Sequence, residues 1–365
     1  MRRVLILFLA VAVGIGLATY YVPHDAASVG SASVTRRSLA TDLAAIAGSG
    51  DYQCFLSEQD SLNAGRPVTV PILGEGSAAG SDGVYATTFA DGWLGQMVQA
   101  EVTGQLVARH GLAVTPGGLA IGRAVLERRI TDVLDTYARG TGSAPSCGGT
   151  GAAVLGSMPA GFAAEQVRAQ TDQSLLAASA AGGGLSDGAL SAFFVAHRSE
   201  FDRVCLSLIE VTSQATAQHL RQVIAGGTPF AQVARTSSVD STTASAGGVA
   251  GCGVVAGTTL LAPVEHLAIG QVSAPVAYNS AFLLVQVTSR TPATLSSVHQ
   301  VVQTVMLLAG QSQVTREIKG ALQAAHVSID PRFGQVKAGT STILPPTNPP
   351  AGILLAPPSG PAGAG

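Results

Sequence analysis

The sequence predicts an α+β protein, in which a small domain built on an antiparallel sheet lies between helical segments and follows a hydrophobic N-terminal helix. Three observations predict this class: an uncharged N-terminal run, helical spacing of apolar residues over 84–138 and 295–325, and a β-α-α-β-α-β-β order over 203–290. The 365 residues suggest about two domains, and an apolar content of 47% can form a sizeable core. A net charge of −2 without a basic block gives no electrostatic footprint for nucleic-acid binding.

The N-terminal run is long enough to cross a membrane. Residues 4–22 carry no charge, and as a helix these 19 residues span roughly 28 Å, about one hydrocarbon core. Arg2 and Arg3 precede the run, so the positive-inside rule predicts that the rest of the chain is exported. We expect residues 1–24 to be an uncleaved anchor. The alternative is a cleaved signal peptide and a secreted protein, although the best small-x-small site, at 30–32, lies late.

Four cysteines, Cys54, Cys147, Cys205 and Cys252, follow the N-terminal run and so lie in the exported part. An oxidising compartment favours disulfides between them. None belongs to a C-x-x-C pair and the seven histidines are scattered, so the sequence predicts neither a metal site nor a cofactor. We expect two disulfides, and the residues by themselves leave three connectivities open.

The segment 51–201 is predicted to be mostly helical. After a first helix that begins near residue 85, Thr115 can cap a second helix whose first residue is Pro116. Two further helices are expected between residues 161 and 200. Residues 25–50 are small and polar, which predicts a stalk between the anchor and this helical part.

The period changes from that of helices to that of strands near residue 203. RVCLSLIEV (203–211) is strand-like; two helices, the loop SSVDSTTASAGGVAG (237–251) and further strands follow. We expect the next long helix, about 295–325, to pack with the helices of 84–138, because their apolar stripes need a partner. Residues 336–365 are rich in Pro, Gly and Ala without periodicity, which predicts a disordered tail.

Five short motifs follow one another in residues 205–290. They are Gly227-x-x-Phe230-x-x-x-Ala234, Ser237 to Asp240, the pair Gly247-Gly248 followed by Gly251, GQVSAPV at 270–276 and VQVTSR at 285–290. In this order and spacing the region resembles the parvulin domain, the rotamase module of the PpiC and SurA peptidyl-prolyl isomerases. The flanking helices resemble the SurA-type chaperone arrangement, and AAHVSIDPRFG at 324–334 resembles the end of actinobacterial members of this group.

The resemblance implies a parvulin domain with a four-stranded antiparallel sheet and surrounding helices, inserted in a helical SurA-like chaperone domain. The expected divisions are a membrane anchor or signal (1–24), a stalk (25–50), an N-terminal helical chaperone domain (51–201), a parvulin-like domain (202–291), a C-terminal helix that completes the chaperone domain (292–335) and a disordered tail (336–365). Because the first two strands of a parvulin domain are neighbours, the resemblance also implies a Cys205–Cys252 disulfide, with Cys54–Cys147 as the other pair.

In parvulins, a proline pocket combines an apolar residue, an aromatic ring, an acid or cysteine and two hydrogen-bonded histidines. The resemblance makes Asp240 the pocket acid and places Leu208, Leu260, Leu283 and Phe230 around the pocket. Leu208 and Leu283 stand where the family has its histidines, and Leu260 stands near the position of the pocket aromatic. The three glycines of the loop let its backbone turn tightly into the next strand.

These departures predict a membrane-anchored extracytoplasmic foldase or chaperone that binds unfolded or proline-containing exported polypeptides. We expect its peptidyl-prolyl cis-trans isomerase activity to be weak or lost, because Asp240 lacks the histidine network; whether the domain is an enzyme stays open. Rotation about an X-Pro bond crosses an amide barrier of roughly 18–20 kcal/mol and requires no cofactor. A fully active isomerase is the alternative, and a structural envelope protein is the third hypothesis.

Overall fold

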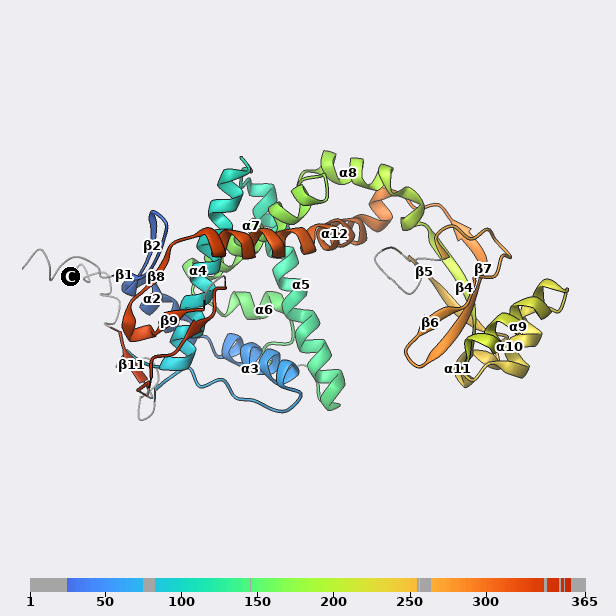
Figure 1. The fold of residues 1–365 in the computed structure, drawn as a ribbon, viewed down its shortest axis with the longest axis horizontal. Coiled ribbons are helices and arrows are strands. Elements are labelled where there is room, and N and C mark those ends of the chain that lie inside the picture. Colours follow the sequence, from blue (N-terminus) through green and yellow to red (C-terminus); the bar gives the residue numbers. More distant parts are fainter. Residues whose placement is uncertain are drawn as a thin grey trace, which may run out of the picture. The chain divides into compact units, whose positions relative to one another are not determined.

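The computed structural model describes residues 25–74, 83–144, 146–254, 256, 264–337, 340–347, 349–350 and 352–355 (Figure 1). The chain divides into two compact units. Unit 1 combines the chain up to Leu176 with the residues from Gln313 onward, and unit 2 comprises Ala177–Ser312. The expected membrane segment, residues 4–22, lies outside the described residues. None of the described helices has the length and hydropathy that a membrane crossing requires.

Helices make up most of unit 1, as the apolar spacing predicts. They are α2 (Arg36–Ala47), α3 (Gly50–Ala64), α4 (Thr87–Arg109), α5 (Pro116–Thr141), α6 (Gly151–Gly156) and most of α7 (Ala160–Ala180). The expected cap is present: Thr115 Oγ1 accepts a hydrogen bond of 3.0 Å from the Gly118 N–H, and Pro116 is the first residue of α5. Aromatic rings from α3, α4 and α7 meet in the core, where those of Trp93 and Phe162 lie 5.7 Å apart.

The expectation of a stalk at 25–50 is wrong. Most of these residues form β1 (Asp25–Val29), β2 (Ala32–Thr35) and α2, and the side chains of Leu39 and Leu43 are fully buried. β1 lies between β2 and β8 (Val327–Ile329) in a three-stranded antiparallel sheet. These strands are too short for periodicity to reveal, and one partner comes from the far end of the chain, so composition alone misled the prediction.

Part of the expected disordered tail, 336–365, is also structured. β9 (Gln335–Val336) pairs with β10 (Ile343–Leu344), and β11 (Gly352–Leu354) pairs antiparallel with β3 (Val84–Ala86). The side chains of Ile343, Ile353 and Leu355 are buried. These few apolar residues among prolines find partners that are distant in sequence, which a local pattern cannot show.

Unit 2 contains a small helical cluster beside its sheet. The end of α7, α8 (Asp187–Ala196), the 3-10 turn η1 (Arg198–Phe201) and the first part of α12 (Leu295–Ala324) pack through a core that includes Phe194, Phe201 and Met306. The two helices expected between residues 161 and 200 are therefore present. Only the residues of α12 from Gln313 onward group with α4 and α5 in unit 1, where Glu317 Oε2 lies 3.1 Å from His110 Nε2.

A four-stranded sheet forms the rest of unit 2. Its order is β5 (Val249–Val254), β4 (Arg203–Val211), β7 (Ala281–Thr291) and β6 (Val276–Tyr278), and every neighbouring pair is antiparallel. Two helices, α9 (Gln214–Ala225) and α10 (Phe230–Ser237), pack on one face of the sheet (Figure 1). The four-stranded antiparallel sheet predicted from the parvulin resemblance is confirmed.

Both disulfides have the pairing that the resemblance implies. Cys205 on β4 and Cys252 on β5 stand directly opposite each other and are bonded. Cys54 of α3 is bonded to Cys147, which lies between α5 and α6. Two disulfides and no free cysteine fit an oxidising compartment.

Candidate functional site

The loop between α10 and β5 is fixed to the sheet. The N–H of Val239 donates to the carbonyl of Glu210 at 2.8 Å, and the N–H of Glu210 donates to Ser238 Oγ at 3.1 Å. These two bonds hold the start of the loop along the end of β4. The small polar residues of 237–251 are therefore a positioned loop and not a slack linker.

Asp240 caps the short helix α11 (Ser241–Ala244). Its Oδ1 accepts from the Thr242 N–H at 2.9 Å, and its Oδ2 accepts from Thr243 Oγ1 at 2.6 Å. The hydrogen bond from the Thr243 hydroxyl, followed by that from the Thr242 backbone, lowers the pKa of the Asp240 carboxyl. The carboxylate is thus kept ionised at the outer side of the loop, with both oxygens already engaged.

The glycine pair at the end of the loop brings it against β4. Gly247 and Gly248 have φ angles of +72° and +86°, which side-chain-bearing residues rarely adopt. A Cβ on Gly248 would lie 2.6 Å from the carbonyl oxygen of Leu208, and the Leu208 N–H donates to the Gly248 carbonyl at 2.7 Å. Gly251 has a φ of +104° and lies opposite Leu206 on β4. The loop therefore meets the strand at Leu208, one of the two positions where the parvulin resemblance predicts a histidine.

Leu208 and Leu283 belong to one apolar cluster on the sheet face opposite α9 and α10. Its members are Val204, Leu206, Val264, Leu283, Val285 and Val287, with the partly buried Leu208, Leu267 and Val276 packed against them. Leu283 is 3% exposed, whereas Leu208 is partly accessible. Branched aliphatic side chains therefore surround both positions at which the parvulin resemblance predicts a histidine.

Phe230 is not part of this face. It is buried in the cluster between the sheet and the two helices, with Ile209 and Leu284 among its neighbours. Successive strand residues point to opposite faces, so Ile209 points toward Phe230 and Leu208 points away from it. The sheet therefore lies between Phe230 and the expected pocket. The expectation that Phe230 lines the pocket is at odds with this position, and Leu260 lies outside the described residues.

The structure adds one residue that the sequence analysis missed. Glu210 follows Leu208 by two positions on β4, so its side chain points to the same face, and it stands directly opposite Leu283. It is partly exposed, and its backbone holds the loop that carries Asp240. The alternation of Val204, Leu206 and Leu208 could have placed Glu210 on this face.

No histidine lies on the described strands of this face, although His266 lies between two members of the cluster, Val264 and Leu267. The only two histidines in the sequence of residues 202–291 are His219, on α9, and His266, and both are exposed. The face therefore combines an apolar patch with Glu210 at its end, and the loop that carries Asp240 runs beside the end of β4. Such a surface can hold an apolar segment of a polypeptide and exclude water from it, and the described residues of its cluster include no pair of side chains that could donate and accept a proton.

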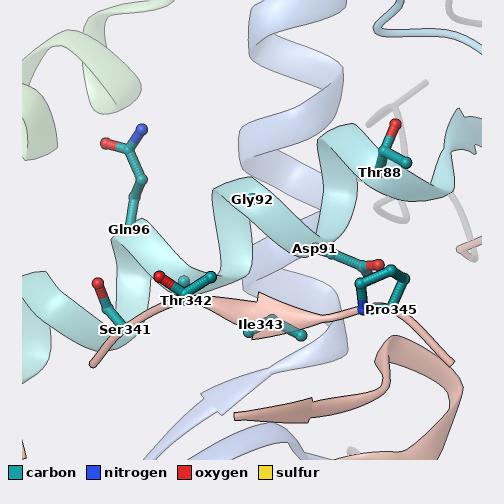
Figure 2. Close-up of a pocket in the computed structure, with 9 residues that line it drawn as sticks. Thr88, Asp91, Gly92, Gln96, Ser341, Thr342, Ile343 and Pro345 are labelled. Atoms are coloured by element: carbon teal, nitrogen blue, oxygen red, sulfur yellow. The ribbon is translucent and has the colours of Figure 1, made fainter. Parts of the chain in front are cut away.

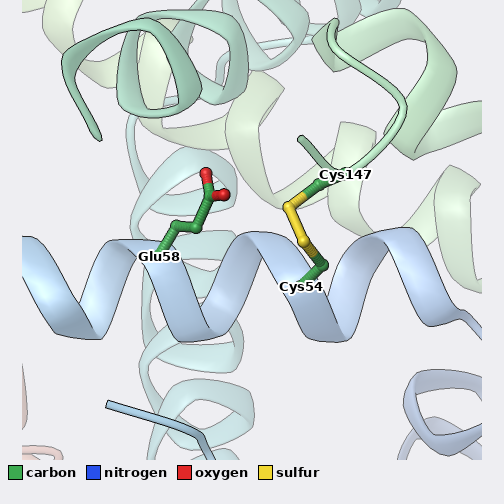
Figure 3. Close-up of side chains that lie close together, drawn as sticks. All are labelled: Cys54, Glu58 and Cys147. Carbon is green, nitrogen blue, oxygen red and sulfur yellow. A yellow bond between two sulfur atoms is a disulfide. The ribbon is translucent and has the colours of Figure 1, made fainter. Parts of the chain in front are cut away.

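A separate cluster in unit 1 joins the Cys54–Cys147 disulfide with Glu58 (Figure 3). Their ligand atoms lie within 4.8 Å of one another, and Ser146 Oγ donates to Glu58 Oε1. Because the two sulfur atoms are bonded to each other, they are not thiolate ligands in this state.

One family model matches the chain. Residues 185–303 match the PPIC-type PPIASE domain, a region that covers the whole four-stranded sheet, the loop with Asp240 and part of the adjoining helical cluster. The resemblance to the parvulin type of peptidyl-prolyl isomerase is therefore confirmed for this region. No curated protein matches the chain.

Several solved structures are similar to it at low identity. The peptidylprolyl isomerase PrsA of Bacillus anthracis is 14% identical, with 63% of this chain and 97% of that chain covered and a TM-score of 0.35. The foldase protein PrsA of Streptococcus pneumoniae is 20% identical, with 64% and 84% covered and a TM-score of 0.32. A SurA-like chaperone of Campylobacter jejuni is 16% identical, with 39% and 62% covered and a TM-score of 0.23. These TM-scores are all below 0.5, and the proposals below do not depend on them.

Proposed function

We propose that this protein is an extracytoplasmic foldase or chaperone that binds unfolded or proline-containing exported polypeptides, with peptidyl-prolyl isomerase activity that is weak or lost. One observation carries the proposal: a parvulin-type domain has an aliphatic cluster where the two pocket histidines would lie. Isomerisation is favoured when a pocket stabilises the twisted amide more than the planar one. An apolar wall binds the planar and the twisted amide of a proline segment about equally, so it favours binding of the segment over isomerisation of its X-Pro bond.

The loss of both histidines at once is consistent with a binding role. A single histidine left without its partner would be a buried polar group with an unmade hydrogen bond, which costs roughly 1–3 kcal/mol. Leucine at both positions avoids that cost and enlarges the apolar surface available to a client. Asp240, which caps α11, serves the loop and keeps its charge at the rim of this surface.

Two assays test this function. The first measures cis-trans turnover of a proline peptide, and the second measures suppression of aggregation of an unfolded protein. We expect weak turnover and clear suppression. Asp240→Asn is the matched variant, since asparagine caps helices as well as aspartate does and removes only the charge. Turnover equal to that of a histidine-bearing parvulin, lost in Asp240→Asn, would instead establish the active isomerase.

The active isomerase is the second candidate, because hydrogen bonds hold the loop that carries Asp240 along the end of β4. A structural envelope protein is the third, and failure to suppress aggregation together with absent turnover would favour it. We also propose that residues 4–22 attach the protein to the cell membrane, or that it is secreted after signal cleavage. The two disulfides support a location in an oxidising compartment outside the cytoplasm. Fractionation of the intact protein with membranes, before and after a high-salt wash, tests the anchor.

A further inference from the structure

A cavity of about 290 Å³ lies in unit 1 between one face of α4 and the tail segment that carries β10 (Figure 2). Its lining includes Asp91, Gly92, Gly95 and Gln96 from α4 and Ser341 and Thr342 from the tail. The helix residues recur at spacings of three and four, which places them on one side of α4. The volume is close to the lower end of the range for small-ligand sites, roughly 300–1,000 Å³.

Two glycines of α4 build this cavity in different ways. A Cβ on Gly95 would lie 2.3 Å from the carbonyl oxygen of Ser341, so the tail can approach the helix only because residue 95 has no side chain. A Cβ on Gly92 would meet nothing within 4 Å. Gly95 therefore lets the tail form one wall, and Gly92 leaves the space beside that wall open.

Asp91 is the unexplained group of this cavity. The residue is 2% exposed, and neither carboxylate oxygen has a hydrogen-bond partner among the described residues. Figure 2 shows its carboxylate at one end of the lining, beside Pro345. Burial raises the pKa of Asp91 to about 7. Every other lining residue is neutral, so nothing in the lining balances the charge when this carboxyl ionises.

We propose that the cavity binds the guanidinium group of an arginine side chain from a polypeptide client, with Asp91 as its counter-ion. The two carboxylate oxygens of Asp91 have no partner among the described residues, and a guanidinium binds a carboxylate through two parallel hydrogen bonds. Both oxygens are covered in the empty cavity, so binding requires the Asp91 side chain to turn toward the guanidinium. The hydroxyls of Ser341 and Thr342 and the amide of Gln96 supply further polar contacts at the lining. The inference rests on the proposed function, because it names the chemistry by which the same chaperone holds exported chains.

The test compares two short fluorescein-labelled peptides that differ at one position, arginine in one and the neutral, equally shaped citrulline in the other. Binding to the full-length protein is measured by fluorescence anisotropy at pH 8 and physiological salt. We expect the arginine peptide to bind roughly tenfold more tightly, as a buried charge-assisted pair implies. Asp91→Asn should abolish this difference, and Gly92→Leu should reduce it by filling the cavity while Asp91 is kept. Asp132→Asn, which removes an exposed carboxylate of α5, should preserve it.

Equal binding of the two peptides to the wild-type protein, or a preference that survives Asp91→Asn, would overturn the inference. Aggregation suppression is measured on the same samples. If suppression is intact while the preference is missing, only the arginine site is wrong. If neither peptide binds and suppression is also absent, the proposed function fails together with the site.

Discussion

Replacing Asp91 by asparagine should make unit 1 more stable at pH 8 than at pH 5, relative to the wild-type protein. Burial raises the pKa of Asp91 from 3.8 to about 7 in the folded protein. Between these two values the folded state keeps a proton that the unfolded state has lost, so the free energy of unfolding falls as pH rises. Asparagine has nearly the same shape and no ionisation, so the variant escapes this loss.

The size of the effect follows from the two pKa values. Taken at face value, they give a loss of about 2.5 kcal/mol between pH 5 and pH 8, since one pKa unit corresponds to about 1.4 kcal/mol. The cavity beside Asp91 can admit water, which screens the charge, so we expect roughly half of this value. At pH 5 part of the difference is already present, because the carboxyl is ionised in the unfolded state, where its pKa is 3.8, and protonated in the folded state. The comparison therefore rests on the further change between pH 5 and pH 8.

Urea unfolding followed by the fluorescence of Trp93 measures this difference. Trp93 is the single tryptophan and lies on α4, so it reports on unit 1 alone. The nearby Asp42, which accepts a hydrogen bond of 2.9 Å from Trp93 Nε1, also has its pKa raised to about 7 by burial. Asp42 is present in both the wild-type protein and Asp91→Asn, so the difference between their free energies of unfolding reports on Asp91. Asp132→Asn serves as the exposed control. A variant whose advantage is the same at pH 5 and pH 8 would show that Asp91 does not titrate as its burial implies.

Three further predictions concern the tail, the pocket and the disulfides. Gly95→Ala should destabilise unit 1 by roughly 1–3 kcal/mol, because the added methyl group would force the tail away from α4. Gly92→Ala, on the same helix, should stabilise unit 1 by about 0.5–1 kcal/mol. Equal effects of the two variants in urea unfolding would contradict the close approach of Ser341 to Gly95. Leu208→His together with Leu283→His should raise proline-peptide turnover by roughly ten- to a thousandfold, and each single variant should not, because either histidine alone lacks its partner. Reduction of both disulfides, which join residues 93 and 47 positions apart, should cost roughly 2–4 kcal/mol each; unchanged thermal unfolding in dithiothreitol would refute that.

The sheet domain could be predicted from sequence because its signals are local and ordered. Five motifs in 205–290 gave the parvulin resemblance, which implied the four-stranded antiparallel sheet and the Cys205–Cys252 bond that the structure contains. The helix cap at Thr115 could also be predicted from sequence. The Thr115 hydroxyl accepts from the Gly118 N–H, one of the N–H groups at the start of a helix that have no partner within the helix. Predictions of this kind depend only on residues close together in the chain.

The predictions of a stalk at 25–50 and of a disordered tail at 336–365 failed for one physical reason. β1 pairs with β8, and β11 pairs with β3, so these short strands are stabilised by partners that are hundreds of residues away. A composition of alanine, proline and glycine contains no trace of such pairing. Phe230 was misplaced for a related reason: a motif gives its position on α10 but not the sheet face on which that helix packs.

The position of Phe230 also bears on which side chains the sheet offers for binding a polypeptide. Phe230 lies in the core between the sheet and its helices, and the opposite face carries a described aliphatic cluster with Glu210 opposite Leu283. Aliphatic groups attract any apolar segment in proportion to buried area and do not distinguish a planar amide from a twisted one. If this face binds clients as we propose, we expect charge to supply the selectivity among them. Asp240 and Glu210 near the sheet, and Asp91 in unit 1, are acidic, so we expect apolar segments that also carry basic residues to bind most tightly.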